Sequence, residues 1–557
     1  MPSSLSFDLH LGPGGRAAAV AQRTAGGPAA RLLLLGDFSG RSAGRAAKAA
    51  TAATASIPAP APAAERWSAR TTLVDIDNLD AVMRLMAPKV ALQIQGRRCE
   101  FAPQSLDDFH PDQLLNSLPP LQQGLARLKA LQDPAQFAKA AAEWDALHVA
   151  TLHAPAAEAA AAAGTKAATA AATAPAGSAG DLLSSLLGGK VQAAARAPAA
   201  PASPASPASP ASPAPHTGID ALLHSAVAGH VVPAAPVHQS AYVAAAQAAL
   251  ADDLRAVLHD PAFQALEGAW RGLQLLVSRL ELGEQLELHL ADAALPDLLA
   301  DLVAAQGRVE ATALCGLFAR RGRDGGLASA EPNNPHWRAV FGLFGFGDTA
   351  VDLGLLAAVG TAAAHAQTPF VAMASAALVR AALAAESEEA ADKTGWTTLR
   401  RSQVAPWLGL MSSPLLLRLP YGRRHEPVQQ LDFEEITGAV QPAPLLWGSG
   451  AIAAAALLGQ ACGETNAGTS TSATINTPNR TLDDLPAWVL RDADSESQLQ
   501  ACAGQYLTEA ETESLQSAGL MTLLSHRSAG AVTLHRWQSV AQPLCGLSMR
   551  PGLQLSI

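Results

Sequence analysis

The sequence contains few of the residues from which catalytic, metal and nucleic-acid sites are usually built. Its five cysteines are scattered along 557 residues with no CxxC pair. That pattern is typical of reduced thiols in a cytosolic protein and disfavours a disulfide framework or a zinc site. Only 15% of the residues are charged, and the formal net charge is -10. Without a dense Lys/Arg surface, we do not expect nucleic acid as a partner.

The chain also lacks a recognisable targeting segment and a long, strongly apolar run. The opening residues "MPSSLSFDLHLGPGG" have neither the basic start nor the apolar core of a secretory signal. Residues 351–385 are rich in apolar residues but include His365, Pro369 and Arg380, which disfavours a membrane span of about 20 residues. We expect a soluble, cytoplasmic protein with no membrane insertion.

Alanine and proline are abundant by contrast, and they divide the chain. Alanine dominates from residue 154, and residues 197–216 repeat a Pro-Ala-Ser triplet. Such a segment cannot bury enough apolar area to offset the entropy of ordering it, so it predicts a solvated spacer. The predicted organisation is a first domain at 1–150, a linker at 151–215 and a second domain at 216–557. Alternating strand and helix signals on both sides predict α/β architecture: two mixed-sheet α/β domains joined by a long Ala/Pro-rich flexible linker.

In the first domain, "RLLLLGDFSGR" (31–41) predicts a buried strand that runs into a turn. The spacing GxxxxGK[ST] of a phosphate-binding loop is absent. "DIDNLDAVMRLMAP" (75–88) predicts a helix capped by Asp77 or Asn78 and ended by Pro88. A calcium loop is disfavoured because Asp80 and Met86 stand where it needs glycine and glutamate.

Two further stretches of this domain predict ordinary structural elements. "VALQIQ" (90–95) reads as a strand. "SLDDFHPDQLL" (105–115) contains Asp107, Asp108 and His110, which could form an acid/base set. A turn followed by a capped helix explains the same residues without a second catalytic group, and is preferred.

In the second domain, residues 252–280 predict two helices separated at Asp260. Adjacent positions of a helix point about 100° apart, so Trp270 is expected in the core and Arg271 beside Glu267, one turn back. Residues 285–292 alternate and predict a strand. Residues 309–318, which include Cys315, also predict an apolar strand.

The string "GFGDTA" (345–350) imitates the GxGxxA of dinucleotide-binding loops. No strand clearly precedes it in the sequence, and no acidic residue follows about 20 positions later, so nucleotide binding is not predicted. Residues 351–366 predict a buried helix, followed by a strand from Phe370. Thr508 and Glu511 predict a capping box for a helix that ends at Gly519, before two strands.

The stretch 396–450 is the most distinctive part of the chain. "PLLLRLPYG" (414–422) predicts a buried strand that ends in a turn, with Arg418 interrupting the apolar run. A buried Arg418 needs a carboxylate partner, for which Glu434 and Glu435 are the nearest candidates. The alternative is that Arg418 points to solvent from an edge strand. The chain has no GxSxG or HExxH motif and no nucleophile beside a base, so we expect neither an enzyme nor a cofactor.

The order of the motifs in this stretch resembles TssC, the large subunit of the contractile sheath of bacterial type VI secretion systems. The resemblance rests on Trp396 followed by "LGL" (408–410), "PLLLRLPYG" (414–422), "DFEE" (432–435) and "LWG" (446–448). The motifs "LLLLGDFSGR", "DIDNLDAVMRLMAP" and "SLDDFHPDQLL" of the first domain resemble TssB, the small sheath subunit. Both sheath subunits are thus expected on one polypeptide.

This resemblance implies a structural protein that polymerises with copies of itself by exchanging edge strands and stacks into a tube around an Hcp-like inner tube, next to baseplate proteins. The alternative function is an accessory protein that caps or regulates a sheath built by other subunits. The assembly candidates carried by the motifs are Asp37, Phe38, Gly40, Trp270, Arg271, Arg418, Pro420, Tyr421, Glu434, Glu435 and Trp447.

A short amphipathic segment at 218–232 is similar in position to the TssC helix that a ClpV-type AAA+ unfoldase uses to recycle contracted sheaths. Its apolar stripe includes Leu222, Leu223 and Val227. A helix that simply packs against the domain is the other interpretation.

Overall fold

The computed structural model describes residues 30–42, 67, 69–153, 238–319, 336–384, 395–437, 444–465, 474–475, 480–491, 497–548 and 554–555. The backbone contacts divide the chain into two compact units. The larger unit comprises Met1–Leu128 and Ala244–Ile557, and the smaller comprises Lys129–Val243. The candidate site lies in the larger unit.

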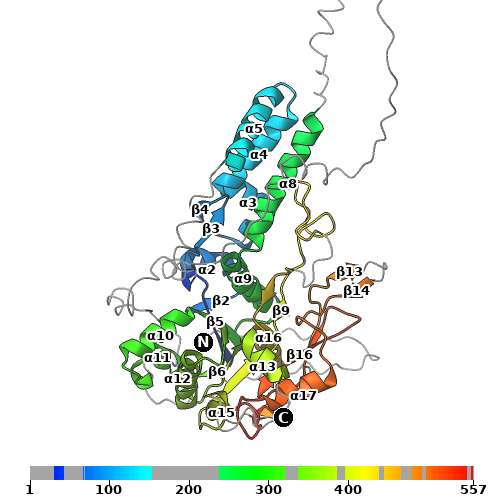
Figure 1. Cartoon of the computed structure of the whole chain (residues 1–557). Coiled ribbons are helices and arrows are strands. Elements are labelled where there is room, and N and C mark those ends of the chain that lie inside the picture. The colour runs from blue at the N-terminus through cyan, green and yellow to red at the C-terminus, as the bar shows by residue number, and fades with distance from the viewer. Residues whose placement is uncertain are drawn as a thin grey trace, which may run out of the picture. The chain divides into compact units, whose positions relative to one another are not determined.

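The larger unit is built on a seven-stranded sheet with the order β15-β8-β7-β6-β1-β5-β2. Figure 1 labels β2, β5 and β6 of this sheet. All neighbouring strands are parallel except β2, which is antiparallel to β5. The strands are β1 (Ala30–Gly36), β2 (Thr72–Val74), β5 (Leu286–Asp292), β6 (Trp337–Phe346), β7 (Phe370–Ala374), β8 (Leu408–Met411) and β15 (Leu520–Met521).

Strand β1 lies inside this sheet, although it comes from the first predicted domain. It pairs with β5 on one side, Leu32 opposite Leu288, and with β6 on the other, Leu33 opposite Val340. Its continuous run of leucines is what a parallel strand covered on both faces requires. The predicted α/β architecture is confirmed, and the strands of both predicted domains meet in one sheet.

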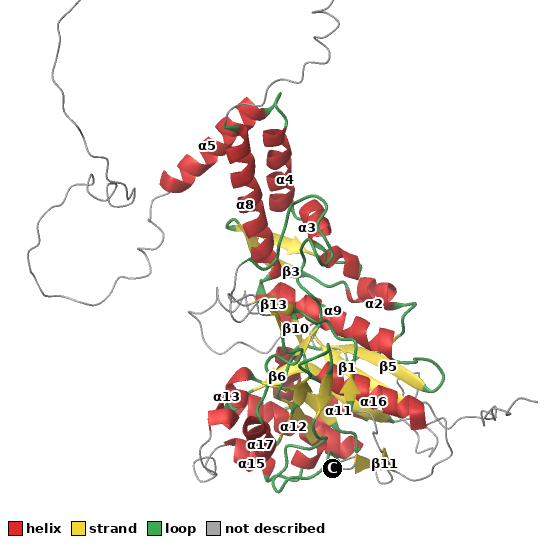
Figure 2. Ribbon diagram, turned by 90° about the vertical axis from the view of Figure 1, so that its right-hand side faces the viewer, coloured by secondary structure: helices red, strands yellow, loops and turns green. Residues whose placement is uncertain are grey.

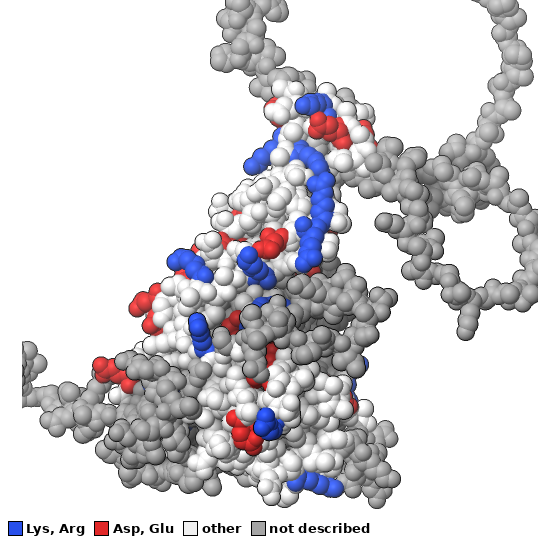
Figure 3. All heavy atoms as spheres, turned by 90° about the vertical axis from the view of Figure 1, so that its left-hand side faces the viewer, with Lys and Arg blue, Asp and Glu red and all other residues white. Residues whose placement is uncertain are grey.

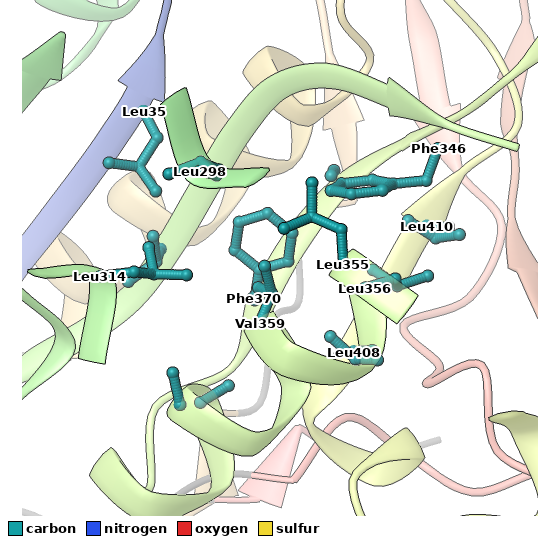
Figure 4. Packing of buried hydrophobic residues seen from close by; sticks show 14 of the residues in the cluster. Leu35, Leu298, Leu314, Phe346, Leu355, Leu356, Val359, Phe370, Leu408 and Leu410 are labelled. Carbon is teal, nitrogen blue, oxygen red and sulfur yellow. The ribbon is translucent and has the colours of Figure 1, made fainter. Parts of the chain in front are cut away.

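The strand order places the chain among doubly wound sheets. Five of the parallel strands lie side by side in the order β5-β1-β6-β7-β8. Numbered by their position along the chain, these strands are 2-1-3-4-5, which is the order of flavodoxin-like sheets. Helices cover both faces (Figure 2). On one face, α10 (Leu295–Ala304), α11 (Ala313–Phe318) and α12 (Ala350–Ala366) pack with Leu33 and Leu35 in one buried cluster (Figure 4). The alternate residues Leu32 and Leu34 are also fully buried, on the face where α16 (Ala451–Thr465) packs. Helix α9 (Pro261–Arg279) packs against α16.

The remaining described elements of the larger unit are shorter. They are α2 (Leu79–Met86), β3 (Val90–Ile94), β4 (Arg97–Phe101), η2 (Leu106–Phe109), α3 (Pro111–Ser117), η3 (Val309–Ala311), α13 (Ala376–Ala384), α15 (Gly395–Arg400), η4 (Ala405–Trp407), β9 (Leu415–Leu416), β10 (Trp447–Gly448), β11 (Thr474–Ile475), β12 (Thr481–Leu482), β13 (Val489–Arg491), β14 (Ser497–Leu499), α17 (Glu509–Ser517), β16 (Leu523–Ser525), β17 (Val532–Leu534) and β18 (Gln554–Leu555).

The smaller unit contains α5 (Phe137–His153) together with the ends of α4 (Pro119–Gln132) and α8 (Gln239–Leu258). The Phe137 and Tyr242 rings meet edge to face at 5.7 Å. The Tyr242 hydroxyl donates to Asp145 Oδ2 at 3.0 Å, and Gln239 Nε2 donates to the Leu131 carbonyl at 2.8 Å. These contacts join α8 to α4 and α5 within this unit.

Most strands and helices lie where the sequence predicts them, including the helix α17 with its Thr508/Glu511 capping box. Residues 309–318 were expected as a strand, which is wrong. They form η3 and α11, because the Thr312 hydroxyl accepts the Cys315 backbone N–H at 3.1 Å and caps a helix. A short apolar run does not distinguish a strand from a buried helix. The expectation that no strand precedes "GFGDTA" is also wrong, since β6 ends at Phe346.

Several other expectations are refined or lie outside the described residues. Of "PLLLRLPYG", only Leu415–Leu416 forms a strand, β9. Asn78 occupies the N-cap of α2 without a capping bond from its side chain. The segment 218–232 and nearly all of the predicted linker lie outside the described residues, so the domain boundaries stay predictions. Among the helices described, none is both long and apolar enough to cross a membrane.

Candidate assembly site

Helix α9 carries the two contacts from which the candidate site is built. Asp260 caps the helix, because its Oδ1 accepts the backbone N–H of Ala262 at 2.9 Å and of Phe263 at 3.1 Å, and Pro261 occupies the first turn. The predicted apolar face is buried and consists of Phe263, Leu266, Trp270, Leu273 and Val277. Its polar residues Glu267 and Arg271 lie beside this face.

The turn after β1 packs against α9 through an aromatic pair. Trp270 is fully buried, and its ring meets that of Phe38 edge to face at 5.3 Å. Trp270 Nε1 also donates a hydrogen bond to the Phe38 carbonyl at 3.0 Å. The first predicted domain is therefore joined to the second by this pair as well as by the sheet, and Trp270 is in the core as predicted.

Asp37 and Gly40 shape the turn that holds Phe38. The Asp37 carboxylate accepts the backbone N–H groups of Arg41 at 2.8 Å and Ser42 at 2.7 Å, and also the Ser42 hydroxyl. Gly40 has φ +71°, and a Cβ there would lie 2.5 Å from the Lys89 carbonyl oxygen. Only glycine fits this conformation at such a close backbone approach.

The second contact is a buried ion network centred on Arg418, which is only 6% exposed. Its Nη1 donates to Glu435 Oε2 at 2.7 Å and its Nε donates to Glu267 Oε1 at 2.7 Å. The prediction that a buried Arg418 pairs with Glu435 is confirmed, and the edge-strand alternative is wrong. Glu434 is exposed instead, and its Oε1 accepts the Arg423 backbone N–H at 3.2 Å.

Arg271 and Tyr421 complete the network. Arg271 Nε donates to Glu267 Oε1 at 2.7 Å, as predicted, and Arg271 Nη2 donates to the Tyr421 hydroxyl at 2.8 Å. The Arg418 guanidinium carbon lies 4.2 Å from the centre of the Tyr421 ring. Two cations thus face two carboxylates, and each buried charge has an opposite charge within hydrogen-bond distance.

The surroundings shift the pKa values so as to favour the charged forms of Arg418 and Glu435 and the neutral form of the Tyr421 hydroxyl. Burial opposes the charge on Arg418, but Glu267 and Glu435 outweigh it and raise the pKa of Arg418 well above its usual value. Burial tends to raise the pKa of Glu435, yet His259 and Arg418 bring it below its ordinary value. His259 Nε2 lies 3.6 Å from Glu435 Oε1, too far for a hydrogen bond. Burial, and to a smaller extent the negative charge of Glu267, raises the pKa of the Tyr421 hydroxyl.

The network closes the base of an exposed loop. Glu435 donates its backbone N–H to the Tyr421 carbonyl at 2.9 Å, and Glu435 Oε2 accepts the Tyr421 N–H at 2.8 Å. Asp112 also holds the loop, because its carboxylate accepts the N–H groups of Gln429 at 3.0 Å and Gln430 at 3.1 Å. Residues 422–434 therefore form a loop with joined ends, anchored to both predicted domains.

The other predicted candidates lie close to this loop. Pro420 is buried beside Arg418 in the chain. Trp447 is half-buried in β10, where it pairs with Leu416 of β9. The sequence did not predict that Glu267 pairs with Arg418, nor that Asp112 binds the backbone of the loop 422–434. Glu267 and Arg418 are 151 positions apart and Asp112 and Gln429 are 317 apart, so no local pattern linked them.

A doubly wound sheet usually binds its ligand where the strand order reverses, here beyond the carboxyl ends of β1 and β6. In this chain, Asp352 Oδ2 occupies the start of α12 and accepts the Gly347 N–H at 3.2 Å and the Thr349 hydroxyl at 2.9 Å. After β1, the Asp37 carboxylate likewise accepts the backbone N–H groups of Arg41 and Ser42. A phosphate would need these N–H groups and would meet like charge. The residues at this crevice do not fit a nucleotide.

Metal chemistry has no counterpart in the described parts of the chain, where no three His, Cys, Asp or Glu side chains gather as ligands. The described part of the face shown in Figure 3 is largely uncharged, with Lys/Arg and Asp/Glu side chains both present. The described residues instead form three contacts between distant parts of the chain. These are the strand β1 inserted between β5 and β6, the Phe38–Trp270 pair, and the buried ion network around Arg418.

Comparison with known proteins agrees with this arrangement. The family model VipB, described as "EvpB/VC_A0108, tail sheath N-terminal domain", matches residues 240–541. This match covers more than half of the chain and contains α9, Arg418 and Glu435. The chain belongs to the VipB tail sheath family.

A known sheath protein also matches, over a shorter range. The type VI secretion system sheath protein TssC1 of Pseudomonas aeruginosa is 29% identical over 225 residues, which cover 38% of this chain and 44% of TssC1. The chain thus aligns with less than half of that relative. The VipB match supports a structural sheath protein and begins after the segment that resembles TssB.

Proposed function

We propose that this VipB-family chain is a complete sheath protomer on one polypeptide, in which residues 1–150 act as the small subunit and residues 216–557 as the large subunit. The observation that carries the proposal is the position of β1. A strand from the TssB-like segment fills the space between β5 and β6 of the family domain. The two halves then fold as one body, which is what a repeating subunit of a stiff tube requires.

In this proposal the protomer polymerises with copies of itself around an Hcp-like inner tube, starts from baseplate proteins, and contracts to propel the inner tube. Contacts between different surfaces of successive copies do not close, and so produce helical filaments. The work would come from the lower free energy of the contracted lattice. The candidate residues Asp37, Phe38, Gly40, Trp270, Arg271, Arg418, Pro420, Tyr421, Glu434, Glu435 and Trp447 would keep each protomer rigid while it rotates.

The buried network supports this mechanical role. Directional bonds among Glu267, Arg418 and Glu435 fix α9 relative to the loop 422–434, whereas apolar packing alone would allow sliding. A ClpV-type unfoldase that engages residues 218–232 would return contracted protomers to use. That part of the proposal rests on the TssC resemblance alone.

Electron microscopy of the purified full-length protein tests the proposal. Hollow helical tubes of uniform diameter support a main sheath subunit. Discrete particles under all assembly conditions would contradict it and favour an accessory protein that caps or regulates a sheath built by other subunits. Arg418→Ala, which removes the cation between Glu267 and Glu435, should reduce the yield of tubes. The matched control is Arg423→Ala, which removes only the exposed pair with Asp432.

A further inference from the structure

Helix α3 of the first predicted domain contacts the loop 422–434 through one carboxylate. The Asp112 side chain is 15% exposed, and its two oxygens accept the adjacent backbone N–H groups of Gln429 at 3.0 Å and Gln430 at 3.1 Å. The Asp112 carbonyl also accepts Gln430 Nε2 at 3.2 Å. Within the described parts of the chain, residues 427–431 make no hydrogen bond to any other partner.

The base and the returning arm of this loop are held by the second predicted domain. At the base, the Glu435 N–H donates to the Tyr421 carbonyl, and the Tyr421 N–H donates to Glu435 Oε2. On the returning arm, Arg255 Nε donates to the Glu434 carbonyl at 3.0 Å, and the Arg255 guanidinium carbon lies 5.5 Å from the centre of the Phe433 ring. The middle of the loop, by contrast, takes its hydrogen bonds from the first predicted domain.

The segment that carries Asp112 docks on α9 through aromatic rings. Phe101 of β4 and Phe109 of η2 both contact Phe263 of α9, with ring centres 5.4 Å and 5.5 Å away. The rings of Phe101 and Phe109 also lie 5.5 Å apart, and all three side chains are buried. Asp112 follows Phe109 by three residues, so packing of this cluster brings its carboxylate to the loop.

We propose that Asp112 is a positioning residue that makes the shape of the loop 422–434 depend on docking of the first predicted domain. A carboxylate suits this role because it accepts two adjacent N–H groups at once, and both hydrogen bonds are charge-assisted. When the segment is docked on α9, these bonds fix Gln429 and Gln430. When the segment separates from α9, both N–H groups return to water, while the base of the loop keeps the bonds within its own domain.

This inference rests on the proposed function and deepens it, because the loop is part of the candidate assembly site. Separation of α3 from α9 is a local opening, which costs less free energy than unfolding of the whole chain and leaves β1 in the sheet. A protomer opened in this way would present a differently shaped loop to its neighbours. The coupling would therefore reserve assembly for protomers whose two halves are docked.

Hydrogen–deuterium exchange of the unassembled full-length chain tests the inference. Asp112→Asn keeps the shape of the side chain, but its amide group turns a donor towards one of the two N–H groups. Exchange in peptides that contain Gln429 and Gln430 should become at least about tenfold faster, as expected for the loss of a hydrogen bond to a charged group. The matched control is Asp107→Asn, which removes an exposed carboxylate from η2. Equal exchange in the two variants overturns the inference.

A second variant tests the dependence on docking. Phe101→Ala removes a ring that contacts both Phe109 and Phe263, and the milder Phe101→Leu replaces it if that protein does not fold. Exchange in the same peptides should become faster, whereas the Glu435 N–H at the base of the loop should exchange as in the wild type. Combined with Asp112→Asn, the variant should add nothing further in these peptides. Exchange at the wild-type rate, or effects that add in full, would overturn the coupling.

The exchange is measured without tubes, so the inference and the proposed function can fail separately. Unchanged exchange in a chain that forms tubes overturns the coupling and leaves the sheath proposal standing. The expected exchange in a chain that stays particulate under every assembly condition supports the coupling and contradicts the sheath proposal.

Discussion

At the scale of the residue, burial decides which ion pairs matter. Arg418 and Glu267 have side-chain exposures of 6% and 0%, whereas Arg423 and Asp432 have 71% and 57%. Removing one member of a buried pair leaves the other charge without water or partner, while an exposed charge is simply hydrated. Arg418 and Arg423 are five residues apart, so substituting each in turn compares a buried pair with an exposed pair in one part of the chain.

The first prediction uses this comparison. Arg418→Ala leaves the buried Glu435 without its guanidinium partner and Glu267 with Arg271 alone, and should lower the free energy of unfolding by about 3–5 kcal/mol. Arg423→Ala should change it little, because its pair is solvated. Urea denaturation of both variants measures the difference, and equal losses would show that the network does not hold the fold.

A second prediction concerns two glycines with the same backbone conformation. Gly40 has φ +71° and Gly96 has φ +72°, but only at Gly40 would a Cβ meet another group, the Lys89 carbonyl oxygen at 2.5 Å. Gly96→Ala should cost about 1–2 kcal/mol for the left-handed backbone. Gly40→Ala should cost distinctly more, because the backbone of the turn must also move. Thermal unfolding of the two variants provides the comparison, and similar melting temperatures would refute the close approach.

The third prediction is a dependence on pH. The folded protein holds the pKa of Glu435 below its ordinary value, so it favours the ionised carboxylate more than the unfolded chain does. This contribution to stability is present above the unfolded pKa and is lost as the pH falls through the folded pKa. The wild type should therefore lose stability between pH 6 and 3 more steeply than Glu435→Gln, as measured by denaturant titration at each pH. Parallel profiles would argue against the ion pair.

At the scale of the element, α9 joins the two predicted domains. Its Trp270 contacts Phe38 in the turn after β1, and its Glu267 contacts Arg418 before the loop 422–434. The contacts of Trp270 with Phe38 hold α9 against the turn after β1. Packing at this joint holds parts of the two predicted domains in contact within the larger unit.

The fourth prediction tests that joint. Phe38→Ala removes a fully buried ring from Trp270 and should cost about 3–5 kcal/mol. Phe344→Ala, at a half-buried ring away from α9, should cost less. Chemical denaturation of both variants gives the ranking, and a mild effect of Phe38→Ala would show that the sheet alone joins the domains.

The sequence was informative where the pattern is local. The leucine run of β1, the alternation of β5 and the capping residues of α9 and α17 predicted their elements, because side-chain periodicity and caps act within one turn or strand. Residues 309–318 were mistaken for a strand because a short apolar run fits either element. The insertion of β1 between β5 and β6 could not be predicted, since Leu32 and Leu288 lie far apart in the chain and parallel pairing leaves no local signal.

At the scale of the whole molecule, two sequence segments that lie far apart in the chain share one sheet. The sheet needs β1, because β5 and β6 each pair with it and not with each other. An open central position would expose two rows of backbone N–H and C=O groups, which is a template for aggregation. In the proposed protomer, one polypeptide would supply each large-subunit half with one small-subunit half.

The fifth prediction follows from the shared sheet. Residues 1–150 and 216–557, coexpressed as two chains, should copurify as a soluble complex. Residues 216–557 expressed alone should aggregate, because β5 and β6 lack their common neighbour. Size-exclusion chromatography distinguishes the outcomes, and a soluble, folded 216–557 on its own would show that β1 is not required.

The most direct measurement is a helical reconstruction by electron microscopy of the filaments that the full-length chain forms. We expect a hollow tube whose repeating unit is a single polypeptide, with β1 lying between its own β5 and β6. Filaments in which that strand is absent from the sheet, or a chain that stays particulate under every assembly condition, would contradict it.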